Sequence, residues 1–74
     1  MKIKFNFKQL LANKMAQKGE PISMREVSRQ TSINIQTLTG MKNNTHTRVD
    51  LTVIERLCDY LGCIPGDLII PAED

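Results

Sequence analysis

The stretch that decides the fold is Ser23-Met24-Arg25-Glu26-Val27-Ser28-Arg29-Gln30-Thr31-Ser32-Ile33-Asn34-Ile35-Gln36-Thr37-Leu38. Ser23 and Glu26 form a capping box, in which the serine oxygen accepts the backbone amide of Glu26 and the glutamate reaches back to the serine amide. This pattern predicts a helix from Met24 to about Thr31. Val27 faces inward in this helix, together with either Met24 or Thr31.

A second helix follows after a short polar break, Ser32-Ile33-Asn34. Asn34 is a good N-cap, and Leu38 and Met41 lie three residues apart on one helix face. The run Asn43-Asn44-Thr45 ends this helix, because asparagine tolerates the left-handed C-cap conformation. Two helices joined so tightly and meeting near a right angle form a helix-turn-helix, which docks DNA; short helix pairs also occur in purely structural bundles.

The chain before this motif predicts a strand and a helix. Apolar and polar residues alternate over residues 2–7, which indicates a short strand. From about Phe7 the apolar spacing becomes helical, and Asn6 is a candidate cap for that helix. Gly19 and Pro21 end it.

The chain after the motif predicts two further helices. Thr52-Val53-Ile54-Glu55 is a second capping box, and Gly62 ends the helix that it opens; Asp50 is a candidate local cap. Pro65 begins a short fifth helix, and residues 68–70 suit a C-terminal strand that Pro71 would stop. The apolar face of the fourth helix consists of Leu51, Ile54, Leu57, Cys58 and Leu61.

These segments together resemble a known family. Residues 23–38 resemble the helix-turn-helix of Cro/cI-type (XRE-family) regulators. Residues 41–44 resemble the end of its third helix, and residues 51–61 and 62–68 are similar to its fourth and fifth helices. The resemblance covers roughly residues 7–70. It implies one all-α domain over residues 1–74 with the five-helix lambda-repressor-like fold, and leaves short N- and C-terminal strands open. The connection at 16–22 is longer than is usual in the family.

The third helix, about Asn34–Lys42, would then be the recognition helix in the DNA major groove. Gln36 can bond adenine in bidentate fashion, and threonine can contact base edges or a thymine methyl. Ile35 would contact a thymine methyl or pack against a neighbouring molecule, and Gly40 would allow close approach to DNA or contact nothing. The candidate DNA-binding residues, including those assigned to phosphates, are Arg25, Asn34, Ile35, Gln36, Thr37, Thr39, Gly40, Lys42, Asn43 and Arg48.

Charge divides the chain into two halves. The net charge of +2 over 74 residues combines +7 in residues 1–48 with −5 in residues 49–74. We therefore expect the first half to face a polyanion and the second half to pack or pair. The chain has 41% hydrophobic residues and neither a membrane-length apolar run nor a signal sequence. Its two cysteines then indicate a reducing compartment, the cytosol or the nucleus, and we expect a cytoplasmic protein.

Enzymatic and metal sites are not indicated. Cys58 and Cys63 are spaced unlike a zinc pair and have only His46 to assist them, so Cys58 is expected to be a small buried residue. The carboxylates form no catalytic pair, and we predict no enzyme, no metal and no cofactor.

The function that we predict is sequence-specific binding of double-stranded DNA by a small regulator, most simply a repressor. A homodimer on two half-sites is expected, formed through the acidic, apolar C-terminal part or through the edges of terminal strands, and we expect no small-molecule effector domain. The alternative is a protein-interaction or antitoxin-like module that keeps the fold without specific DNA contacts. Ile35, Met24 and Gly40 favour this alternative.

Overall fold

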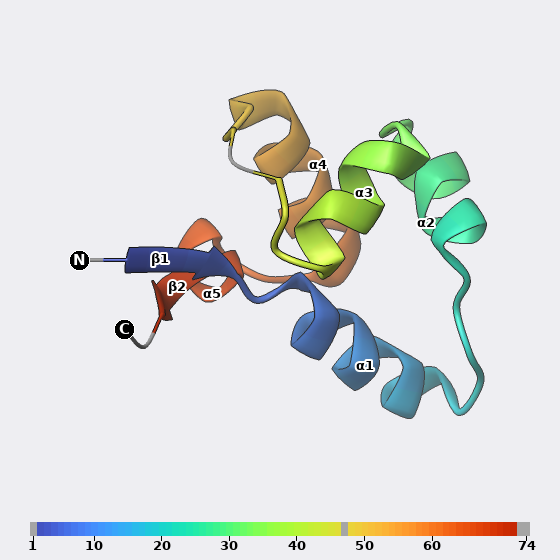
Figure 1. Ribbon diagram of the computed structural model, residues 1–74. Helices are drawn as coiled ribbons and strands as arrows, with labels where there is room; N and C mark the ends of the chain where they lie inside the picture. Colours follow the sequence, from blue (N-terminus) through green and yellow to red (C-terminus); the bar gives the residue numbers. More distant parts are fainter. Residues whose placement is uncertain (1, 47, 73–74) are drawn as a thin grey trace.

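The computed structural model describes residues 2–46 and 48–72. It confirms a mostly helical domain with five helices and a two-stranded antiparallel sheet, the strands joining the two ends of the chain (Figure 1). The elements in chain order are β1 (Lys2–Phe5), α1 (Phe7–Lys18), α2 (Met24–Thr31), α3 (Ile35–Lys42), α4 (Leu51–Leu61), α5 (Pro65–Leu68) and β2 (Ile69–Ala72).

The helix-turn-helix forms where it was predicted. The Ser23 hydroxyl oxygen accepts the Glu26 amide at 3.1 Å and so caps α2. The predicted bond from the Ser23 amide to the Glu26 side chain is wrong, because the Glu26 carboxylate instead accepts from the side chains of Arg29 and Gln30 on the same helix. The connection to α3 turns at Ser32, whose φ of 59° is left-handed. A serine therefore adopts there the conformation that glycine takes most readily.

Two side chains of α2 hold this turn. The Ser28 hydroxyl donates to the Ile33 carbonyl at 2.6 Å, and the Thr31 hydroxyl donates to the Val27 carbonyl at 2.7 Å while accepting the Ile33 amide at 3.3 Å. Ile33 lies between two polar residues in the sequence, but its side chain is 3% exposed and belongs to the core. The turn is therefore fixed by both hydrogen bonds and apolar packing, which sets the angle between α2 and α3.

The core fills the space between the helices and the two-stranded sheet. Its buried apolar residues are Phe5, Phe7, Leu11, Ile22, Val27, Ile33, Leu38, Met41, Ile54, Leu57, Cys58 and Leu68. Thr31 is buried with them, whereas Met24 is half-buried, so Thr31 is the second inward position of α2. Leu51 was predicted on the apolar face of α4 but is 74% exposed, because it lies at the first position of the helix, beyond the edge of the core.

Two predicted helix starts are corrected by the structure. Asp50, not Thr52, caps α4: its carboxylate accepts the amide of Thr52 at 2.8 Å. Asn6 precedes α1 without a side-chain cap and instead donates its side-chain amide to the Asp67 carbonyl at 3.3 Å. The end of α3 is confirmed: Asn43 is its C-cap, and Asn44, with φ 57°, takes the left-handed conformation that the run 43–45 predicts.

Pro71 does not stop β2 but lies within it, opposite Ile3. In a two-stranded ribbon each strand has an unpaired outer edge, where a residue without an N–H group loses no ladder bond. The connection between α1 and α2 is also shorter than predicted, since α1 continues to Lys18 before the left-handed Gly19. Among the described helices none has the length and apolar character needed to cross a membrane.

Candidate nucleic-acid interface

The exposed side of α3 presents a mixed polar and apolar surface. Ile35 is 42% exposed, and Gln36 and Thr39 are also exposed, whereas Thr37 is half-buried against the domain. Asn34 caps the helix, because its side-chain oxygen accepts the Gln36 amide at 2.7 Å. The amino end of α3 therefore offers side chains from three successive positions, residues 34–36, to a partner.

The polar groups of α3 differ in how far they are already engaged. The Gln36 side chain makes no hydrogen bond to any described residue, so both its donor and its acceptor are available. The Thr39 hydroxyl donates to the Ile35 carbonyl at 2.9 Å, which leaves its lone pairs and its methyl group for a partner. Gln36 is thus the side chain of α3 best suited to a bidentate contact with adenine.

The candidate phosphate-binding cations lie on α2, at the end of α3 and in the connection that follows α3. Arg25, in the first turn of α2, and Arg48, after α3, are exposed; Lys42, at the end of α3, is half-buried. The ion pairs among the described residues are Lys18–Glu20 and Glu26–Arg29, so these three cations remain unneutralised there. Arg29 is the basic residue of the motif whose charge is already compensated.

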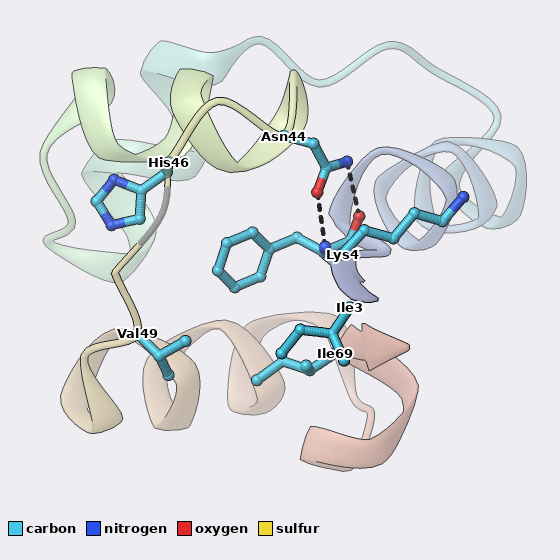
Figure 2. Close-up of a pocket in the computed structure, with 7 residues that line it drawn as sticks. Ile3, Lys4, Asn44, His46, Val49 and Ile69 are labelled. Carbon is cyan, nitrogen blue, oxygen red and sulfur yellow. Dashed lines mark hydrogen bonds between the residues drawn. The ribbon is translucent and has the colours of Figure 1, made fainter. Parts of the chain in front are cut away.

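Asn44 connects the end of α3 to the start of the chain. Its side-chain oxygen accepts the Phe5 amide at 2.7 Å, and its side-chain nitrogen donates to the Phe5 carbonyl at 3.1 Å. Figure 2 shows both bonds, which reproduce the pairing of a neighbouring strand across 39 positions of sequence. We call this pair of bonds the Asn44 clamp; no local pattern predicts it beyond an asparagine suited to a turn.

Gly40 has a structural explanation within the domain. A Cβ atom added there would lie 3.1 Å from the Cβ of His46. The Gly40 carbonyl also accepts the amides of Thr45 at 2.9 Å and of His46 at 3.2 Å. The glycine thus lets the chain fold back closely against α3, and its contact with DNA stays a prediction. Asn43 lies at the C-cap of α3 with its side chain exposed.

An apolar hollow lies behind this turn. It has a volume of about 290 Å³ and is lined mainly by Ile3, Phe5, His46, Val49 and Ile69 (Figure 2). The His46 ring lies 6.4 Å from the Phe5 ring, and the histidine is half-buried. This hollow brings together no pair of catalytic groups.

The two cysteines are free thiols near the end of α4. Cys58 is buried, as predicted, and its carbonyl accepts the Cys63 amide at 3.0 Å. Burial, and next the adjacent Cys58, raise the pKa of the Cys63 thiol to about 11. A thiol with a raised pKa is a poor nucleophile and a poor metal ligand. The described residues contain no cluster of three or more His, Cys, Asp or Glu side chains that would hold a metal ion.

Five short helices with a tight α2–α3 connection and an exposed α3 define a helix-turn-helix protein. The family model for the Cro/C1-type HTH DNA-binding domain matches residues 10–74, and the chain belongs to that family. Searches of curated proteins and of solved structures gave no significant match. The membership confirms the resemblance drawn from residues 23–38 and 62–68, and with it a role as a DNA-binding regulator.

Proposed function

We propose that this protein binds double-stranded DNA sequence-specifically by inserting α3 into the major groove. The observation that carries the proposal is the exposed amino end of α3, where Gln36 has an unengaged amide and Ile35 an apolar side chain able to contact a thymine methyl. With 8 residues, α3 is about 12 Å long, a length that the ~12 Å wide groove accepts.

The flanking cations set the position of the protein on the duplex. Arg25 and Lys42 lie on the two helices of the motif, and Arg48 lies in the connection that follows. Contacts from such groups to phosphates fix register and orientation, while contacts from α3 to base edges specify the sequence. Asn34 and Asn43 add side-chain amides at the two ends of α3 for the same purpose.

Repression follows most directly from occupancy. A domain bound across promoter base pairs excludes other proteins from them, so we propose that the protein is a cytoplasmic repressor and assign it no enzymatic activity. We also propose a homodimer on two half-sites about one helical turn apart, since one α3 offers few base contacts. Apolar side chains that remain exposed support a further interface: Ile3, Val49, Leu51 and Ile64.

The decisive experiment is selection of bound duplexes from a random pool, followed by mobility shifts over a salt series. We expect one enriched sequence, bound with a steep fall of log K against log salt. Gln36→Ala should abolish the preference for that sequence, whereas Gln17→Ala, an exposed glutamine on α1, should retain it. Arg48→Ala should weaken binding to all sequences equally. Enrichment of no sequence, or an unchanged preference in Gln36→Ala, would refute the proposal.

The second candidate function is a protein-interaction or antitoxin-like module. The exposed Ile35 and the internally bonded Thr39 hydroxyl favour it, because they reduce the polar groups available to bases. Under this alternative, selection enriches nothing and Ile35→Ser disrupts a protein complex instead.

Light scattering tests the proposed homodimer by measuring the molar mass of the protein alone and on DNA. A protein that is monomeric at high micromolar concentration and remains monomeric on DNA would exclude the dimer.

A further inference from the structure

A second hollow lies beside the carboxyl end of α3. It has a volume of about 430 Å³ and is formed by β1, the start of α1, the end of α3 and the turn that follows. Lysines from three elements surround it, together with side-chain amides and no carboxylate. Its lining residues are Lys4, Phe5, Asn6, Lys8, Gln9, Ala12, Lys42 and Asn44.

The three lysines of this hollow are Lys4, Lys8 and Lys42, and we call them the lysine cluster. Lys4 and Lys8 are exposed, and Lys42 is half-buried. The ion pairs among the described residues involve none of them. The first turn of α1 contains no acidic residue either, so no carboxylate of that turn neutralises Lys8.

The Asn44 clamp fixes the cluster in place. It bonds the turn after α3 to the backbone of Phe5, the neighbour of Lys4. The backbone amide of Asn6 donates to the Leu68 carbonyl at 2.7 Å, and this bond anchors the chain between Lys4 and Lys8. The positive charges at the start of the chain are therefore held against the recognition helix and do not lie on a free arm.

We propose that the lysine cluster binds backbone phosphate of the same DNA whose bases contact α3, an inference that rests on the proposed function. Ammonium groups donate in three directions to phosphate oxygens. The side-chain amides of Asn6 and Gln9 each use one N–H within the protein, on the Asp67 carbonyl and the Asn13 side chain, and each keeps a second N–H as a neutral donor. Because α3 is about as long as the groove is wide, its carboxyl end, with Lys42, lies at the wall of the groove, where the backbone runs. DNA contact thereby extends from the helix-turn-helix onto β1 and α1.

The test is the salt dependence of DNA binding by the full chain. Each phosphate contact adds about 0.9 to the magnitude of the slope of log K against log salt. Lys4→Gln combined with Lys8→Gln should lower that magnitude by about 1.8, equally for the selected duplex and for an unrelated duplex. Lys18→Gln, an exposed lysine at the other end of α1, is the matched control and should leave the slope unchanged. A double variant with the wild-type slope and a wild-type melting temperature would overturn the proposal.

Two further readouts separate the sources of failure. If Gln36→Ala leaves sequence preference intact while the double lysine variant lowers the slope, the proposed base contacts fail and the lysine cluster stands. If the reverse holds, the cluster fails and the proposed function stands. Titration of ¹⁵N-labelled protein with inorganic phosphate covers a free-anion site: saturating amide shifts at Lys8 and Gln9, with an unchanged DNA slope, would reassign the hollow to a small anion and overturn its role in DNA binding.

Discussion

Replacing Asn44 with alanine removes both bonds of the Asn44 clamp and places an alanine at a φ of 57°. Each bond contributes about 1 kcal/mol net, since both bonds are partly buried and the variant leaves the backbone N–H and carbonyl of Phe5 without these partners. The left-handed backbone costs an alanine roughly 1 kcal/mol more than it costs an asparagine. The sum, about 3 kcal/mol, corresponds to a fall in melting temperature of roughly 12–24 °C for a domain of this size.

Two companion variants divide this loss into its causes. Asn44→Gly removes the bonds but suits the left-handed backbone, so about 2 kcal/mol should be lost. Asn43→Ala is the matched control: the neighbouring asparagine is exposed, lies at φ −90° and makes no side-chain hydrogen bond among the described residues, so we expect a change within about 0.5 kcal/mol. Circular dichroism during heating and in urea measures all three. Equal stabilities of Asn44→Ala and Asn43→Ala would refute the reasoning.

Four other variants or conditions test single features. Ser23→Ala should lower the free energy of unfolding by about 1 kcal/mol through the lost cap; an unchanged urea midpoint would contradict this. Gly62→Ala should lower the free energy of unfolding by about 1 kcal/mol through backbone strain alone, since φ is +69° and the added Cβ would have no atom within 4 Å apart from its chain neighbours. Gly62→Asn should lower it less. Gly40→Ala should be close to neutral in the wild type but stabilise a His46→Gly background by about 1 kcal/mol, a difference that a thermal double-mutant cycle detects. The Cys63 thiol ionises at its usual 9.0 when unfolded and at a pKa of about 11 when folded, so urea midpoints should fall as pH rises above 9, and less so in Cys63→Ser.

The parts of the fold that follow from the sequence are those set by local chemistry. Ser23 and Asn34 cap their helices as predicted, because a cap bonds an amide only two or three positions away. Gly62 ends α4 for a similarly local reason, its left-handed backbone. Ser23, Asn34 and Gly62 together set the start of both motif helices and the end of α4, and the family membership confirms the fold that they predict.

The parts that could not be predicted depend on distant partners or on close competitors. Asp50 and Thr52 are both suitable caps, and only the direction in which the chain enters α4 decides for Asp50. Ile33 lies between polar neighbours, so its burial follows from the packing of the turn and not from periodicity. The Asn44 clamp joins residues 39 positions apart, a distance at which no local pattern operates.

The Asn44 clamp links the stability of the domain to the proposed DNA surface. Ordering a flexible lysine-bearing arm on DNA would consume conformational entropy at the moment of binding. Here β1 is already paired with β2 and bonded to the turn after α3, so this entropy is lost during folding instead. It follows that an Asn44→Ala protein, studied well below its melting temperature, should still contact bases through Gln36 while binding phosphate less well through Lys4. Loss of general affinity without loss of sequence preference is therefore the property that would connect the clamp, the lysine cluster and the recognition helix in one mechanism.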